Sequence, residues 1–74
     1  MTERFYLEYK DLTSEELERM LEKRLDKLSA LYGKLREAIS KDSLEEYWRV
    51  NEETRIVRCQ IGAIQIIRNQ RGLD

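Results

Sequence analysis

The sequence contains no histidine and no proline, and it has one cysteine and three glycines. The single cysteine excludes a disulfide within the chain, and without histidine or a cysteine pair we expect no zinc site. Cys59 lies among apolar residues with no base beside it in the sequence, so we interpret it as a small core residue. We therefore expect no enzymatic activity, no catalytic residue, no cofactor and no bound metal.

Long hydrophobic runs and an excess charge of one sign are also missing. No apolar segment approaches the length that crosses a bilayer, and the charged residues 1–10 do not have the pattern of a signal peptide. The 14 basic and 15 acidic residues give a net charge of −1, which argues against a general nucleic-acid binder. We expect a cytoplasmic protein with no membrane partner and no DNA or long RNA partner.

The 74 residues are enough for one domain, over residues 1–74. A core of this size usually needs further support from a disulfide, a metal or a partner subunit. Because the first two are not expected here, we predict that the chain forms a homo-oligomer.

The scarcity of proline and glycine favours long, unbroken helices. Residues 1–11 alternate aromatic and charged side chains, and we interpret them as a mobile arm with at most one helical turn. Thr-x-x-Glu and Ser-x-x-Glu capping boxes predict that helices begin at Thr13 and Ser43, and the expected helices span residues 13–39 and 43–71. The predicted fold is all-α: an antiparallel helical hairpin with a short N-terminal arm, assembled as a homo-oligomer.

One arginine lies on the apolar side of the first long helix. Arg24 is in line with Leu17, Leu31 and Ala38, at steps of seven residues. The simplest interpretation is that its aliphatic stem lies along the apolar surface while its charged end reaches water. The alternative is that Arg24 binds an anion.

The segment RCQIGAIQIIRNQ, residues 58–70, is unusually apolar for this chain. On a helical wheel the apolar residues of 56–67 cover roughly 220°, whereas one neighbouring helix needs a stripe of about 100°. We therefore predict that the apolar surface outside this stripe packs against another subunit. Gly62 allows a second backbone or a flat ligand to come close, and a tightly packed helix pair is the simpler alternative. Arg68 is expected to face a neighbour and to pair with a carboxylate or a phosphate.

Two blocks of the sequence carry a family resemblance. They are YKDLTSEE, residues 9–16, and QIGAIQIIR, residues 60–68. Both resemble segments of the small phage-encoded sponge proteins that counter the bacterial CBASS defence. The first block is similar to that family's Tyr-basic-acidic-Leu-Thr-x-Glu-Glu entry to the first helix. The second block is similar to its Gln-x-Gly-x5-Arg run on the last helix. Tyr47, Trp48 and Thr54 stand near corresponding positions of that family.

The resemblance implies an all-helical hexamer that binds cyclic di- or trinucleotide second messengers in the host bacterial cytosol without cleaving them. By the resemblance, Tyr9 stacks on a base and Arg24 contacts a phosphate. Arg68 binds cyclic trinucleotides near a symmetry axis, and Gln60 and Gly62 complete the expected ligand-binding set. The same sequence also fits a helical protein–protein interaction module that has no small-molecule ligand. A helical bundle that binds structured RNA is a third alternative, and the near-zero net charge counts against it.

Overall fold

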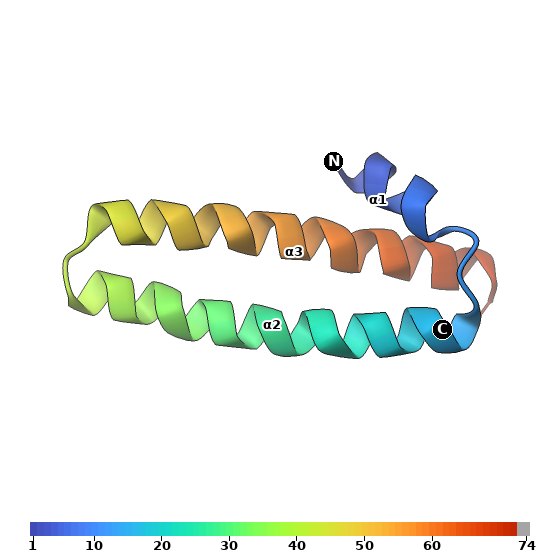
Figure 1. Ribbon diagram of the computed structural model, residues 1–74, viewed down its shortest axis with the longest axis horizontal. Coiled ribbons are helices and arrows are strands. Elements are labelled where there is room, and N and C mark those ends of the chain that lie inside the picture. The colour runs from blue at the N-terminus through green and yellow to red at the C-terminus, as the bar shows by residue number, and fades with distance from the viewer. Residues whose placement is uncertain (73–74) are drawn as a thin grey trace.

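The computed structural model describes residues 1–72, and within that range it contains three α-helices and no strand. Helix α1 spans Thr2–Tyr9, α2 spans Ser14–Ser40 and α3 spans Leu44–Gln70. The two long helices lie side by side and run in opposite directions, and α1 lies against the C-terminal part of α3 (Figure 1). The molecule measures 44 × 20 × 15 Å. The prediction of an all-helical chain is confirmed.

Helix α2 begins with the capping box that the sequence predicts. The Thr13 hydroxyl oxygen accepts a hydrogen bond from the Glu16 backbone N–H at 3.1 Å, and the Thr13 N–H donates to the Glu16 carboxylate at 3.0 Å. Two N–H groups that have no partner inside the helix are thereby satisfied. The backbone hydrogen bond holds the pKa of the Glu16 carboxyl below its ordinary value, because the ionised form is the better acceptor.

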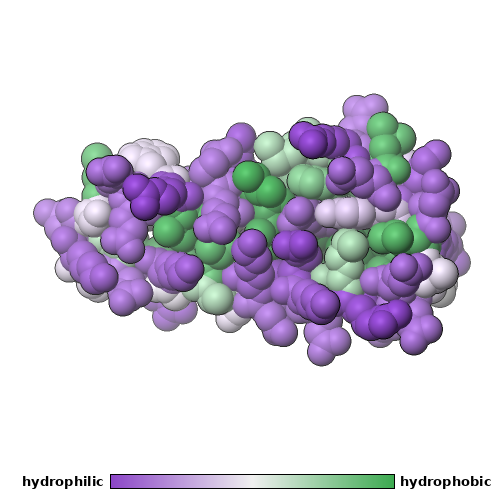
Figure 2. Space-filling view, in the orientation of Figure 1, coloured by the Kyte–Doolittle hydropathy of each residue, from purple (hydrophilic) through white to green (hydrophobic). Residues whose placement is uncertain are grey.

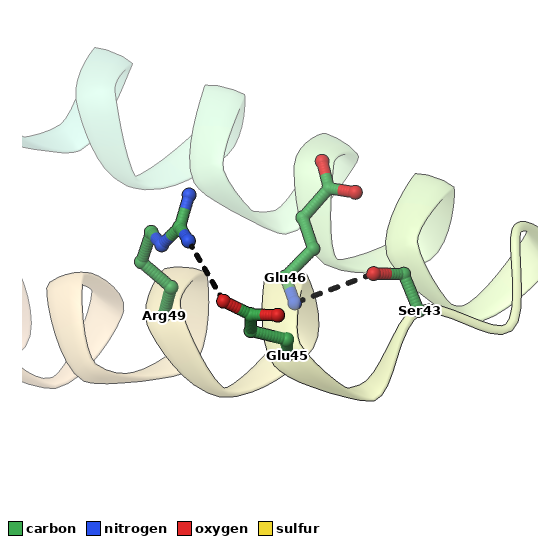
Figure 3. A network of polar contacts seen from close by, with 4 residues as sticks. All are labelled: Ser43, Glu45, Glu46 and Arg49. Atoms are coloured by element: carbon green, nitrogen blue, oxygen red, sulfur yellow. Dashed lines mark hydrogen bonds and ion pairs between the residues drawn. The ribbon is translucent and has the colours of Figure 1, made fainter.

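Helix α3 begins with half of the predicted capping box. The Ser43 hydroxyl accepts from the Glu46 N–H at 3.4 Å, while the Glu46 carboxylate points away from Ser43 (Figure 3). One turn later, Arg49 and Glu45 form an exposed ion pair at 3.4 Å. The tight connection from α2 depends on Asp42, whose φ of 55° lies in the left-handed region that aspartate tolerates better than most residues. Ser43 alone therefore supplies the side-chain cap of α3.

The N-terminal segment is a two-turn helix, where the sequence led us to expect a mobile arm. Phe5 and Tyr9 are four residues apart, so the helix brings their rings together at a centroid distance of 5.8 Å. Tyr9 is buried against Leu17, Ala63, Ile64 and Ile67. A helix of eight residues is not stable alone in water, so packing against α3 holds α1 in place. The alternating pattern that suggested an arm was overridden by this tertiary contact.

The docking of α1 also explains the wide apolar sector of α3. Ala63 and Ile67 pack in the cluster that contains Tyr9, whereas Val57 and Ile61 pack with Leu31 of α2. The surplus apolar surface is therefore covered largely by α1 of the same chain. Our prediction that this surface requires a second subunit is wrong for most of the sector. None of the helices within residues 1–72 has an apolar stretch long enough to cross a membrane.

Replacing the N-cap threonine tests the local control of α2. We expect Thr13→Ala to lower the free energy of unfolding by about 1 kcal/mol, since it leaves the Glu16 N–H without its partner. The pKa of Glu16 is depressed in the folded state, so the stabilisation by its carboxylate is present above the unfolded pKa. The stabilisation by the Glu16 carboxylate is lost as the pH falls through the pKa of Glu16 in the folded protein. Thr13→Ala keeps the backbone N–H that mainly lowers this pKa, so both proteins should lose this stabilisation in acid, and most of the difference caused by the missing Thr13 hydroxyl should persist.

Urea unfolding at one fixed protein concentration, followed by circular dichroism, measures the difference. Ser29→Ala is the matched control, because Ser29 is exposed within α2 and its change should alter stability by no more than about 0.5 kcal/mol. Equal stability of Thr13→Ala and the wild type at neutral pH would show that the capping box does not determine the start of α2.

Candidate functional site

Tyr9 is the centre of the candidate site. It is the last residue of α1, and 9% of its surface is exposed. Burial raises the pKa of its phenol above the ordinary value of 10.0, while the positive charge of Arg24 opposes that shift. The Glu8 carboxylate raises the pKa further, and the Gln60 side chain lowers it. The phenol therefore lies within reach of one residue from α2 and one from α3.

Arg24 occupies a core position of α2, between the buried Leu17 and Leu31. The residue is half-buried, and its Nε is buried without a hydrogen-bond partner. A buried donor that lacks a partner typically costs about 1–3 kcal/mol, so the chain keeps a destabilising group at this position. Only the Nε is buried in this way, and Arg24 also lines an open cleft, so the interpretation of Arg24 as an aliphatic stem whose charged end reaches water stays beside the anion-binding one.

Gln60 supplies the complementary group from α3. Its side chain approaches the Tyr9 phenol, yet its Oε1 is buried and has no hydrogen-bond partner. Arg24 and Gln60, the two residues from α2 and α3 that influence the Tyr9 phenol, thus each carry a buried polar atom without a partner. Buried polar groups in proteins are normally paired, and exceptions call for an explanation such as a bound water, ion or ligand. One of the two unpaired atoms is a donor and the other is an acceptor.

Gly62 lies under the first turn of α1 rather than at an open surface. A Cβ built on Gly62 would meet Thr2 Cγ2 at 4.0 Å, an ordinary van der Waals distance. The second backbone that this glycine was expected to admit is therefore α1 of the same chain. The structure does not bring Gly62 into the group formed by Tyr9, Arg24 and Gln60.

Arg68 lies apart from the other predicted residues. It is half-buried in the last turn of α3, eight residues beyond Gln60. That spacing corresponds to about 12 Å along the helix axis. At this position its positive charge interacts favourably with the negative end of the α3 helix dipole. Three of the five predicted residues, Tyr9, Arg24 and Gln60, are thus brought together, and Gly62 and Arg68 are not.

A cationic cleft adjoins Arg24 on the outside of α2. It has a volume of about 380 Å³, and two apolar and four charged residues line it. These are Leu12, Met20, Glu16, Arg19, Lys23 and Arg24. The Glu16 carboxylate is already engaged by the Thr13 N–H. Within residues 1–72 none of the three cations belongs to an ion pair, because the pairs formed there use Lys27, Lys41, Arg49 and Arg55.

The chemistry of this cleft suits an anion with flat apolar parts. Guanidinium groups bind phosphate or carboxylate oxygens in pairs, and Leu12 and Met20 offer apolar surface beside them. Sequence reasoning missed Arg19 and Lys23. Arg19 and Lys23 are four residues apart and so lie on neighbouring turns of one helix face, and Lys23 directly precedes Arg24; this spacing was the available signal.

A second hollow lies at the opposite end of the molecule, where α2 turns into α3. It has a volume of about 150 Å³, and its lining includes Asp42 and Tyr47 but no cation. A phosphate would meet no positive charge there. Among residues 1–72, no three metal-ligating side chains of His, Cys, Asp or Glu are clustered to hold a metal ion.

No family model matches this chain, and neither a curated protein nor a solved structure does.

Replacing Arg24 by an uncharged residue of similar length tests whether it is kept for binding. We expect Arg24→Met to raise the free energy of unfolding by about 1 kcal/mol, because it removes a buried donor that has no partner. Urea unfolding at a fixed protein concentration measures the change. Arg36→Met is the matched control: Arg36 is exposed on the same helix, and its replacement should have little effect. A loss of stability specific to Arg24→Met would mean that Arg24 has a structural partner.

Proposed function

We propose that this chain binds cyclic di- or trinucleotides and sequesters them without cleaving them. The observation that carries the proposal is that Arg24 Nε and Gln60 Oε1 are buried without partners, on the two residues from α2 and α3 that influence the Tyr9 phenol. The resemblance to the phage sponge proteins supplies the class of ligand. The site then acts in the bacterial cytosol, and it holds its ligand by contacts alone.

The charges around Arg24 support a ligand with more than one phosphate. Arg19, Lys23 and Arg24 carry three positive charges against the single carboxylate of Glu16. A cyclic dinucleotide has two phosphates and a cyclic trinucleotide has three, so these cations would be neutralised by one ligand. The Gln60 Oε1 accepts a hydrogen bond, which suits the amino or imino group of a base.

The surroundings of Tyr9 favour a polar role for its hydroxyl. One face of the ring is stacked on Phe5, and little of the side chain is exposed. A base can stack on this ring only after the surrounding side chains move, whereas the hydroxyl is already influenced by the charge of Arg24 and by the Gln60 side chain. We therefore assign the Tyr9 hydroxyl as the contact to the ligand, in place of the base stacking that the resemblance implies.

A stripe of exposed apolar residues on α2 supports self-association. Leu25, Tyr32 and Ile39 follow one another at steps of seven, and they are 47%, 40% and 64% exposed. Such spacing is the pattern of a seam between packed helices. Figure 2 shows hydrophobic residues that reach the surface among hydrophilic ones on one face of the molecule. We propose that this stripe joins copies of the chain into a homo-oligomer.

The resemblance sets the proposed oligomer at six copies. It also assigns Arg68 to a second site, where copies of this residue meet near a symmetry axis around a cyclic trinucleotide. Arginines brought together around an axis repel one another unless an anion lies between them. The half-buried position of Arg68, away from Tyr9 and Arg24, is compatible with a separate site.

The exposed apolar stripe also favours a second candidate function. A helix of another protein could pack against Leu25, Tyr32 and Ile39 and make the chain an interaction module. In that case the unpaired groups of Arg24 and Gln60 would have no ligand. Direct ligand binding separates the two functions.

Addition of a cyclic dinucleotide should raise the melting temperature of the purified protein. At a free ligand concentration of 100 times Kd, binding adds about 2.7 kcal/mol to the stability of the folded state. For a chain of this size that corresponds to roughly 10 °C or more. Differential scanning fluorimetry with cyclic dinucleotides, cyclic trinucleotides and the matching linear nucleotides measures the shift.

Three variants connect the shift to the site. Arg24→Met and Tyr9→Phe should each weaken binding about tenfold or more, because each removes a polar contact to the ligand while keeping the size of the side chain. Arg36→Met, on an exposed part of α2, should bind as the wild type does. Absence of a shift with every cyclic nucleotide would refute sequestration and favour the interaction module.

A charge introduced into the stripe tests the oligomer. We expect the wild type to have a mass that is a multiple of 9.0 kDa and Tyr32→Lys to give a smaller species, since a buried lysine would be desolvated at the seam. Size-exclusion chromatography with light scattering reports the masses. Ala30→Lys is the control, because Ala30 is exposed on another face of α2 and should keep the wild-type mass. A wild-type protein that stays at 9.0 kDa at high concentration would contradict self-association.

A further inference from the structure

The connection between α1 and α2 is held by one side chain from the far end of the sequence. The Arg71 guanidinium donates to the Leu12 carbonyl at 2.6 Å, to the Lys10 carbonyl at 3.0 Å and to the Ser14 hydroxyl at 3.3 Å. All three acceptors lie within five consecutive residues, on both sides of the Thr13 cap. A guanidinium suits this task because its N–H groups point in several fixed directions at once.

The acceptors have no better partner in the local structure. Helix α1 ends at Tyr9, so the Lys10 and Leu12 carbonyls lie outside any helix and must be satisfied by a side chain or by water. The neighbouring residue Gln70 makes a second tie, because its Oε1 accepts a hydrogen bond from the Tyr6 hydroxyl at 2.9 Å. Two adjacent residues at the end of α3 therefore hold the chain on both sides of Tyr9.

The same segment forms part of the candidate site. Tyr9 immediately precedes Lys10, whose carbonyl binds Arg71, and Leu12 lines the cationic cleft next to Arg24. A shift of residues 10–12 would move Tyr9 from its buried place and would widen the cleft at Leu12. The placement of both features thus depends on contacts that lie outside the cleft.

We propose that Arg71 is a positioning residue, which fixes residues 10–14 and thereby holds Tyr9 in its buried place against α2 and α3 and Leu12 at the edge of the cleft. This inference rests on the proposed function for its consequence in ligand binding. Its structural part, the placement of Tyr9, is measured without a ligand. Arg71 itself is outside the lining of the cleft, so its effect on binding is transmitted through Tyr9 and Leu12.

A purely structural role for Arg71 predicts a different result. The side chain lies at the C-terminal end of α3, where a positive charge stabilises any helix through the helix dipole. Loss of that stabilisation would lower the melting temperature and would leave the surroundings of Tyr9 unchanged. The two roles therefore differ in what happens to Tyr9.

The test compares Arg71→Gln with the wild type by carbon NMR of protein labelled at the tyrosine Cζ, with the Tyr9 signal assigned from Tyr9→Phe. In the wild type, burial keeps the pKa of Tyr9 above 10.0. In Arg71→Gln we expect that pKa to fall towards the ordinary value, because the phenol becomes more accessible to water. Circular dichroism should still show folded α2 and α3. Arg58→Gln, at an exposed arginine of α3, should leave the Tyr9 titration unchanged.

Ligand binding gives the second readout. Affinity for a cyclic dinucleotide should fall about tenfold in Arg71→Gln and stay at the wild-type level in Arg58→Gln. A folded Arg71→Gln protein with a lower melting temperature but a wild-type Tyr9 titration would overturn the proposal. A displaced titration in a protein whose wild type binds no cyclic nucleotide would support the positioning role of Arg71 and refute the proposed function.

Discussion

The apolar sector of α3 is wider than one neighbouring helix can cover, and this constraint organises the rest of the molecule. One side of the sector packs on α2 through Val57 and Ile61, and the other side is covered by α1 through contacts of Ala63 and Ile67. The short α1 would not persist alone, so each element is stabilised by burying the other. Because α1 must dock there, Tyr9 at its end is carried to the seam between α2 and α3.

The seam is also where the chain departs from the rule that a small core is apolar. Arg24 interrupts the line of Leu17, Leu31 and Ala38, which are each almost fully buried. Its buried Nε and the buried Gln60 Oε1 weaken a core that has little stability to spare. The proposed ligand would pair with both groups, which would offset their cost to the core.

Sequence patterns predicted the long helices because their signals are local. Thr13 and Ser43 act on N–H groups three residues away, and both helices begin where these caps indicate. The fate of residues 2–9 depended on contact with residues about 60 positions later, which a local pattern cannot encode. The same limit applied to the site. The odd position of Arg24 was visible in its spacing, whereas the contacts made by Arg71 exist only after α1 has docked.

The attachment of α1 also determines how a ligand reaches the buried groups. Tyr9 is buried against α2 and α3, and Arg24 and Gln60 influence its phenol, so a molecule that pairs with both residues would enter while α1 is displaced or would approach from the cleft beside Arg24. Displacing eight residues exposes far less apolar surface than unfolding α2 and α3, so α1 opens at a lower free energy than the whole chain unfolds. A ligand bound beneath Tyr9 would resist that opening, because its own contacts are lost when α1 leaves. Under the proposed function, slow release of the ligand would follow from the same contacts that place α1 on α3.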